Sequence, residues 1–179
     1  MPYSSENFDQ KIEKILKKIS PKEFFDIGAG AGKYGIMTKR IYPFINTTAI
    51  EIEKDYIAKF DLNKIYSEVW NISALDLMKE KFIDKSFDVV MMGDVIEHLK
   101  KSEGVDLLNF LVYRTRWIII EFPYHYLQNS VDGYYSEAHM SVWDKSDFSL
   151  FESKFYKKKS QRLVIIKGYL ENKISLDKV

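Results

Sequence analysis

The segment that most constrains the fold is residues 24–35, where a hydrophobic run meets closely spaced glycines. Residues 23–27 read as a short buried strand and residues 33–41 as a helix. Between them, Gly28 and Gly30 have no Cβ and can take positive φ, so the backbone can bend sharply and lie against a ligand. Amides at the start of the next helix then point at that ligand. The segment predicts a nucleotide-cofactor loop, with a glycine turn that binds nothing as the alternative.

The spacing of the glycines does not match a dinucleotide loop directly. Such a loop usually reads Gly-x-Gly-x-x-Gly at the end of its strand. Counted from Gly28, the third glycine falls on Lys33. Counted from Gly30, the pattern fits through Gly32 and Gly35, but it then begins too far past the strand. The loop alone therefore leaves the identity of the cofactor open.

Strand-like and helix-like segments alternate along the rest of the chain. Residues 8–19 carry apolar side chains at helical spacing, so we expect residues 1–20 to form a helix that covers one face of a sheet. Alternation of this kind predicts right-handed crossovers and a mainly parallel sheet. Strands are expected at 23–27, 47–52, 66–70, 86–93, 117–120, 154–158 and 162–166, and further helices at 33–41, 54–63, 75–79, 102–113 and 145–151.

The predicted fold class is therefore α/β: a Rossmann-like, seven-stranded, mainly parallel sheet with helices on both faces. The last two strands are expected to form an antiparallel edge. With no linker or repeat in sight, residues 1–179 are interpreted as a single domain. A nicotinamide dehydrogenase would normally need a second, substrate-binding domain.

The composition excludes several classes of protein. A formal net charge of +1 produces no strong field toward nucleic acid or an acidic membrane. Lysines cluster in residues 11–22 and 154–159, but interspersed acids favour solvated faces. The absence of cysteine excludes disulfides, thiolate metal sites and cysteine nucleophiles. No leader-like segment or long apolar run is present, so we expect a cytoplasmic protein without a membrane span.

An acidic residue follows the second predicted strand. Glu51 lies about 20 residues past the glycine loop, where a carboxylate can accept both hydroxyls of a ribose. Glu53 is on the same side of the strand and is the nearby rival. An exposed strand-end carboxylate without a ligand is the simpler alternative. Glu51 supports a nucleoside cofactor, and both NAD and S-adenosylmethionine contain that ribose.

Three segments resemble a known family and so distinguish between these two cofactors. The glycine loop continues into Gly-Lys-Tyr-Gly at residues 32–35, Asp-Val-Ile-Glu-His-Leu occupies residues 94–99, and His-x-Ser-x-Trp occupies residues 139–143. Together with Asp26 before the loop, they resemble class I S-adenosylmethionine-dependent methyltransferases, in particular a branch of small proteins. The resemblance covers nearly the whole chain and implies S-adenosyl-L-methionine as the cofactor.

The resemblance also implies the cofactor-binding residues. In the family, the acid before the loop organises the methionine amino group, and the residues after the third strand lie beside the adenine. Asn71 stands where the family commonly has Asp, and its side-chain oxygen could still accept a hydrogen bond from the adenine amino group. The implied set is Asp26, Gly28, Ala29, Gly30, Glu51, Asn71, Ile72, Gly93 and Asp94.

The predicted catalytic residues are His139, His98 and Glu97. Methyl transfer is an in-line displacement at an activated carbon, so a base is needed only for a reluctant nucleophile such as a hydroxyl. His139 is expected to be the base or a substrate anchor, with His98 and Glu97 supporting it. His125 lies outside the matching motifs.

A divalent metal site is a more specific alternative to catalysis by a histidine base. Asp94, Glu97 and His98 share one predicted helical turn, and His139 could complete the ligand set. This resembles metal-dependent RNA 2'-O-methyltransferases that act on small-RNA 3' ends, in which the metal would hold vicinal hydroxyls. Asp94 replaces their usual Glu, and the chain has no basic stripe for a polynucleotide. We therefore predict no metal and no nucleic-acid partner.

The sequence also bears on which molecule accepts the methyl group. No Asn/Asp-Pro-Pro-aromatic motif follows the fourth strand, and cytosine C5 chemistry would need a cysteine. Residues 124–135 mix aromatic rings with polar donors and acceptors, which favours O-methylation of a small polar or glycan-like acceptor. A non-catalytic module that binds the nucleoside or a protein is the alternative from another class. The acceptor, the methylated atom and the oligomeric state stay open at this point.

Overall fold

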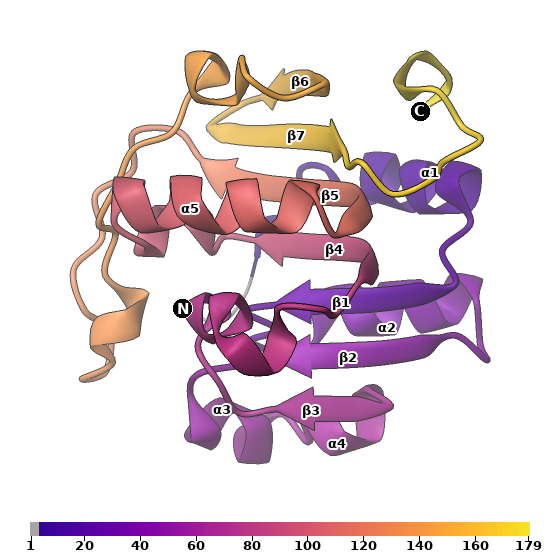
Figure 1. Ribbon diagram of the computed structural model, residues 1–179. Helices are drawn as coiled ribbons and strands as arrows, with labels where there is room; N and C mark the ends of the chain where they lie inside the picture. The colour runs from indigo at the N-terminus through magenta and orange to yellow at the C-terminus, as the bar shows by residue number, and fades with distance from the viewer. Residues whose placement is uncertain (1–3) are drawn as a thin grey trace.

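The computed structural model describes residues 4–179, and a seven-stranded sheet forms its centre (Figure 1). The strand order is β3-β2-β1-β4-β5-β7-β6, with β1 to β5 parallel and β7 antiparallel to both of its neighbours. This arrangement confirms the predicted fold class. The strands are β1 (Glu23–Ile27), β2 (Asn46–Ile50), β3 (Glu68–Trp70), β4 (Phe87–Gly93), β5 (Thr115–Pro123), β6 (Ser153–Lys158) and β7 (Gln161–Lys167).

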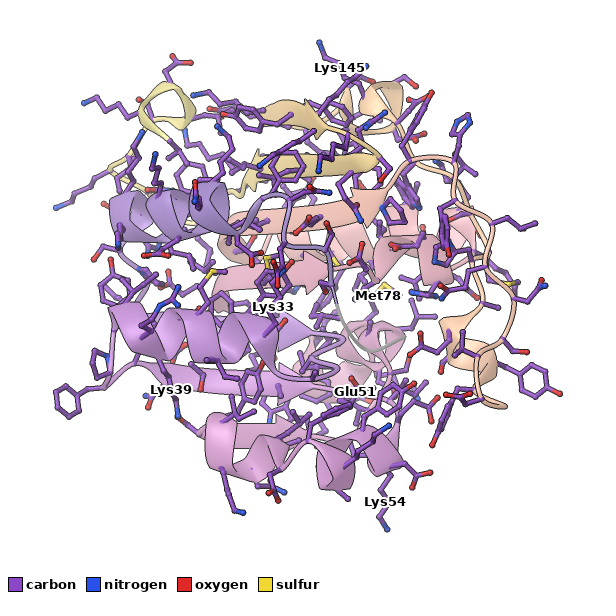
Figure 2. All side chains as sticks on the ribbon, turned by 180° about the vertical axis from the view of Figure 1, so that it is seen from behind. Lys33, Lys39, Glu51, Lys54, Met78 and Lys145 are labelled. Atoms are coloured by element: carbon purple, nitrogen blue, oxygen red, sulfur yellow. The ribbon has the colours of Figure 1, made fainter. Side chains whose placement is uncertain are left out.

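Helices cover both faces of the sheet. Helix α5 (Lys101–Val112) lies on one face, while α1 (Asp9–Ile19) and α2 (Lys33–Ile41) lie on the other (Figure 1). Figure 2 shows the second face from behind, with Lys33 at the start of α2. The short helices α3 (Lys54–Lys59) and α4 (Leu62–Ile65) flank β3 at the edge of the sheet.

Successive side chains along each central strand point to opposite faces of the sheet and pack into two separate apolar cores. In β1, Phe24 packs with α1 and α2, whereas Phe25 and Ile27 point into the core under α5. The same alternation continues in β4 and β5, which are almost completely buried on both faces. Such strands read as continuous hydrophobic runs, which is why the sequence identifies them.

The structure differs from the prediction in several short elements. The helix expected over residues 54–63 is broken because Asp61 takes a left-handed φ of 50°. The elements expected at residues 75–79 and 145–151 are 3₁₀ segments, η1 (Ala74–Met78) and η5 (Lys145–Phe148). Short 3₁₀ turns suit segments without a sustained apolar stripe.

One long segment lies outside the layers. Residues 124–144, which we call the strap, leave β5 and run past the carboxyl ends of the parallel strands to α3 (Figure 1). Its only helical turn within the described chain is η4 (Tyr135–Glu137). A long connection without regular structure at this edge of a parallel sheet suggests a functional role. Within residues 4–179, no helix has the length and apolar character to cross a membrane.

Candidate active site

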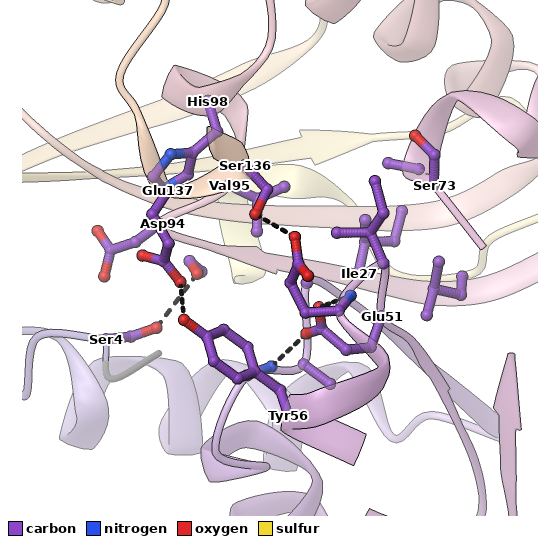
Figure 3. Close-up of a pocket in the computed structure, with 18 of the residues that line it drawn as sticks. Ser4, Ile27, Glu51, Tyr56, Ser73, Asp94, Val95, His98, Ser136 and Glu137 are labelled. Atoms are coloured by element: carbon purple, nitrogen blue, oxygen red, sulfur yellow. Dashed lines mark hydrogen bonds between the residues drawn. The ribbon is translucent and has the colours of Figure 1, made fainter. Parts of the chain in front are cut away.

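A cavity of about 210 Å³ opens at the carboxyl ends of β1, β2 and β4. In open α/β sheets this edge, near a switch in strand order, is where ligands bind. Figure 3 shows the side chains that converge there, among them Ile27 of β1, Tyr56 of α3, Asp94 after β4 and Glu137 of the strap. The lining residues are Ser4, Ile27, Gly28, Ala29, Gly30, Lys33, Tyr34, Ile50, Glu51, Ile52, Glu53, Tyr56, Ile72, Ser73, Ala74, Gly93, Asp94, Val95, His98, Leu99, Ser136 and Glu137.

The glycine loop forms the floor of this cavity. Gly28 and Gly30 have positive φ of 69° and 50°, and Gly28 donates its amide hydrogen to Ile50 O at 2.7 Å. A Cβ on Gly28 would lie 2.3 Å from Val95 Cγ2, so the close approach requires glycine. The turn therefore brings the backbone against the cavity, as the sequence predicted.

Glu51 closes the end of β2 against the loop. Its Oε2 accepts the Gly30 amide hydrogen at 2.8 Å, and its Oε1 accepts that of Glu53 at 2.9 Å. The side chain is only 4% exposed, yet it lines the cavity. Burial raises the pKa of Glu51, and the two amide bonds counteract the shift. The carboxylate is thus fixed beside the loop, in the position expected of a ribose acceptor.

Asp26 lies beneath the loop and does not line the cavity. It is fully buried, and the Tyr66 hydroxyl donates to its Oδ2 at 2.5 Å. Tyr66 also accepts the Gly35 amide hydrogen at 3.1 Å, so the pair supports the start of α2. Burial raises the pKa of Asp26 to about 7. Its Oδ1 has no hydrogen-bond partner within the described chain.

Asn71 likewise lies beside the cavity rather than in its wall. Its Nδ2 donates to Glu51 O and to Ile52 O, both at 2.9 Å, and so holds the end of β2. The neighbouring Ile72, Ser73 and Ala74 line the cavity instead. Ile72 therefore lies where an adenine contact was predicted. Ser73 and Ala74 carry no motif that would have identified them.

Gly93 and Asp94 line the cavity at the end of β4, as predicted, and the N-terminal segment reaches them. Ser4 Oγ donates to Gly93 O at 3.1 Å, and the Ser5 amide donates to Asp94 Oδ2 at 3.2 Å. These contacts join residues 89 positions apart. Sequence reasoning missed Ser4 because no local pattern signals such a contact.

A cluster of imidazoles and a carboxylate lies beside the cavity. Ligand atoms of Glu97, His98 and His139 lie within 4.8 Å of one another, and the two imidazole centroids are 4.8 Å apart. Asp94 is not in this group. It has a φ of 53° and precedes the 3₁₀ turn η3 (Ile96–His98), so the single helical turn expected to contain Asp94, Glu97 and His98 does not form.

The hydrogen bonds of the cluster fix the imidazole tautomers. His98 Nδ1 lies 3.2 Å from Ala138 O, and His139 Nδ1 lies 2.7 Å from Tyr126 O. A carbonyl only accepts, so Nδ1 carries the proton in each neutral ring and Nε2 keeps its lone pair. Burial lowers the pKa of His98 and raises that of Glu97. His125 instead stacks on Tyr124.

A second, more open cavity adjoins the first. Ile52, Glu53, His98 and Ser136 line both cavities, whereas His139 lines neither. His98 therefore lies at the junction. The remaining lining residues of the second cavity are Lys100, Glu103, Gly133, Tyr134, Tyr135, Ala138 and Met140.

Comparisons with known proteins agree with this geometry. The profile of a family described as "Methyltransferase domain" matches residues 25–108, from β1 into α5. No curated protein was found to match the chain by sequence.

Solved structures share the fold at low sequence identity. The N-terminal domain of EvdMO1 with SAH bound is 14% identical, with a TM-score of 0.68 over 93% of this chain and 83% of that one. The methyltransferase domain of a bacterial Hen1 protein, CtHen1, is 14% identical, with a TM-score of 0.65 over 90% and 96%.

A candidate O-methyltransferase of Nostoc punctiforme is 13% identical, with a TM-score of 0.66 over 90% of this chain. The present chain spans only 56% of that protein's length. The matched profile, the order of the strands and the glycine loop facing Glu51 all fit a methyltransferase fold. Residues 25–108 match a methyltransferase-domain family, and the chain has the Rossmann-like fold of solved methyltransferase structures.

Proposed function

We propose that the protein transfers the methyl group of S-adenosyl-L-methionine to an oxygen of a small polar or glycan-like acceptor. The observation that carries this proposal is the junction of the two cavities at His98. A donor in the first cavity and an acceptor in the second would face each other there. Methyl transfer needs mainly such alignment, because the donor carbon is already activated by the sulfonium.

The lining residues fit the cofactor. Glu51, held by the Gly30 and Glu53 amides, would accept the ribose hydroxyls, and the glycine backbone would run along the nucleoside. Ile72 offers an apolar contact for the adenine, and Gly93 and Asp94 lie where the methionine end would bind. When bound, the cofactor supplies the methyl group that is transferred.

His98 is the favoured general base. Its lowered pKa keeps the ring neutral near pH 7, and the contact with Ala138 O leaves Nε2 able to accept a proton. An acceptor hydroxyl in the second cavity could release its proton to that nitrogen as it attacks the methyl carbon. His139, the base predicted from the sequence, packs edge-on against His98 and would act through it.

Metal-assisted RNA 2'-O-methylation is the second candidate function. The cluster of Glu97, His98 and His139 supports it, because both imidazoles turn their Nδ1 to a carbonyl. That arrangement is typical of metal-bound histidines. Both carboxylate oxygens of Glu97 are buried without a hydrogen-bond partner among the described residues. Glu97, His98 and His139 would hold the cation, which would lower the pKa of the attacking hydroxyl.

Two experiments test these proposals. Calorimetry with S-adenosylmethionine and S-adenosylhomocysteine is expected to show binding of both; binding of neither would contradict an enzyme and favour a non-catalytic module. Transfer from methyl-labelled cofactor is then measured with glycans, small hydroxylated molecules and RNA oligonucleotides. Activity that survives EDTA supports the first function. Activity on RNA that EDTA abolishes and Mn²⁺ restores supports the second.

Substitutions separate the roles of the two histidines. His98→Ala is expected to reduce the transfer rate by 10²-fold or more, about the usual contribution of a general base, and to spare cofactor binding. His139→Ala is expected to reduce the rate less if it acts only through His98. An equal loss in both variants, together with lost metal binding, would favour the metal-assisted function instead.

A further inference from the structure

The strap closes over the cofactor cavity through three side-chain hydrogen bonds to α3 and the residue before it. The Tyr56 hydroxyl donates to Glu137 Oε1 at 2.8 Å, and Ser136 Oγ donates to Glu53 Oε1 at 2.5 Å. The Tyr134 hydroxyl donates to Asp55 Oδ2 at 2.9 Å. Figure 3 shows Tyr56, Ser136 and Glu137 among the side chains that line the cavity, with the Tyr56–Glu137 hydrogen bond dashed.

The other end of this part of the strap is fixed to the His98 turn. The Met140 and Ser141 amides both donate to Glu97 O, at 2.8 and 3.0 Å. Ala138 O accepts from His98 Nδ1. Residues 134–141 therefore bridge α3 and the proposed base, His98, and they form a wall of both cavities.

The strap brings a carboxylate to a cavity that is already acidic. Glu51, Glu53, Asp94 and Glu137 line the cofactor cavity, against Lys33 as the only lysine or arginine among the described lining residues. Lys33 Nζ lies 2.5 Å from Asp9 Oδ1, so a carboxylate partly neutralises it. The cavity therefore carries an excess of negative charge and suits a cationic ligand.

Glu137 lies beside the point where the transferred group must pass. Ser136 borders both cavities, and the next side chain, Glu137, is 8% exposed and turns into the first. The methyl carbon must face the junction at His98, so the sulfur that carries it lies on the cofactor side of that junction. During transfer the electron pair of the breaking carbon–sulfur bond returns to sulfur, and the sulfonium becomes a neutral thioether.

We propose that Glu137 is a cofactor-binding residue that recognises the positive charge of the sulfonium. This inference rests on the proposed function. A carboxylate in a partly desolvated site attracts a cation much more strongly than it would in bulk water. That attraction is lost after transfer, so Glu137 would favour the methylated cofactor over the demethylated product.

The test measures charge discrimination rather than binding alone. Glu137→Gln keeps an oxygen that can accept from Tyr56 but removes the charge. Calorimetry is expected to show that its affinity for S-adenosylmethionine falls about tenfold while that for S-adenosylhomocysteine changes less than about twofold. Sinefungin, which carries an ammonium group near the sulfonium position, is expected to follow S-adenosylmethionine. Glu137→Asp, which keeps the charge, is expected to retain the discrimination.

Two control variants separate charge from structure. Glu152→Gln removes an exposed carboxylate that lines neither cavity, and it is expected to leave both affinities unchanged. Tyr56→Phe removes the hydrogen bond and keeps the Glu137 charge, so both ligands are expected to weaken by the same factor.

The outcomes distinguish this inference from the proposed function. If the native protein binds neither ligand, the proposed function fails and the role of Glu137 fails with it. If the native protein binds both and Glu137→Gln weakens them equally, or weakens neither, only the role of Glu137 is overturned. Circular dichroism verifies that each variant is folded before its affinities are compared.

Discussion

Two carboxylic acids are buried beneath the active site, and each accepts a hydrogen bond from a tyrosine. Asp26 accepts from Tyr66, and Glu121 Oε2 accepts from Tyr34 at 2.7 Å. Neither carboxyl group is exposed to solvent. Burial is the largest cause that raises the pKa of Asp26 to about 7 and that of Glu121 to about 8. Both groups therefore change protonation near neutral pH.

These raised pKa values predict that the protein loses stability as the pH rises. The unfolded carboxyls titrate near pH 4, so between pH 4 and about 8 the folded state binds more protons than the unfolded state. The free energy of unfolding then falls with pH and levels off above about 8. Urea unfolding at pH 5.5 and 8.5 is expected to show a smaller loss for Glu121→Gln than for the native protein. Glu152→Gln, at an exposed site, should keep the native slope, and an equal slope in both variants would contradict the prediction.

Gly28 is where a single methyl group is expected to abolish cofactor binding. Gly28→Ala places a Cβ 2.3 Å from Val95 Cγ2 at a φ of 69°, so the loop or the Val95 side chain beside the cavity must shift. Gly133→Ala has a similar backbone cost, about 1–2 kcal/mol, but its Cβ meets nothing within 4 Å. Both variants are expected to be less stable in urea, and only Gly28→Ala to lose S-adenosylmethionine binding by calorimetry. Native affinity in Gly28→Ala would show that the loop does not contact the cofactor.

At the scale of elements, helix α1 packs on one face of the sheet and is an integral part of the hydrophobic core. Its apolar face is fully buried against β1, β4, β5 and β7. Leu16→Ala is expected to lower the free energy of unfolding by about 2–5 kcal/mol, as for other large-to-small core changes. The exposed Lys14→Ala on the same helix is expected to change it by less than about 0.5 kcal/mol. A small loss for Leu16→Ala in urea unfolding would show that α1 packs only weakly.

The elements that the sequence predicts well have a strong local signal. Helix α2 begins and ends as expected, at Lys33 and Ile41, because the glycine loop precedes its apolar stripe. The central strands differ by at most a few residues, because their hydrophobic runs are continuous. Glu51, whose acidity and position after β2 were the only clues, does line the cavity.

What could not be predicted depends on contacts between distant residues. The left-handed φ of Asp94 separates it from His98, although their spacing suits one helical turn. Asn71 turns its amide to the backbone just after β2, at Glu51 and Ile52, which no motif could reveal. Glu137 enters the cavity only because the strap crosses to α3 and Tyr56. Such contacts follow from the path of the chain and not from its local pattern.

At the scale of the whole molecule, residues that are far apart in the sequence line one cavity. Ser4 near the N-terminus, Glu51 after β2 and Glu137 in the strap all line it. No residue of β5, β7 or β6 lines the cofactor cavity. A ligand in this cavity therefore contacts the glycine loop, α3, β4 and the strap at once, and its binding is linked to global unfolding.

This linkage predicts a thermal shift that is specific for the cofactor. At one hundred times its dissociation constant, a ligand that binds only the folded state adds about 2.7 kcal/mol. For a chain of this length, that corresponds to a rise in Tm of about 5–10 °C. S-adenosylmethionine is expected to produce this shift, and NAD, which offers the same ribose, is expected to produce none. Glu51→Ala is expected to lower the Tm of the ligand-free protein, because its carboxylate also accepts the Gly30 and Glu53 amide hydrogens, and to remove the further shift that S-adenosylmethionine produces. A shift with NAD, or one that survives in Glu51→Ala, would contradict the assignment of this carboxylate to the cofactor ribose.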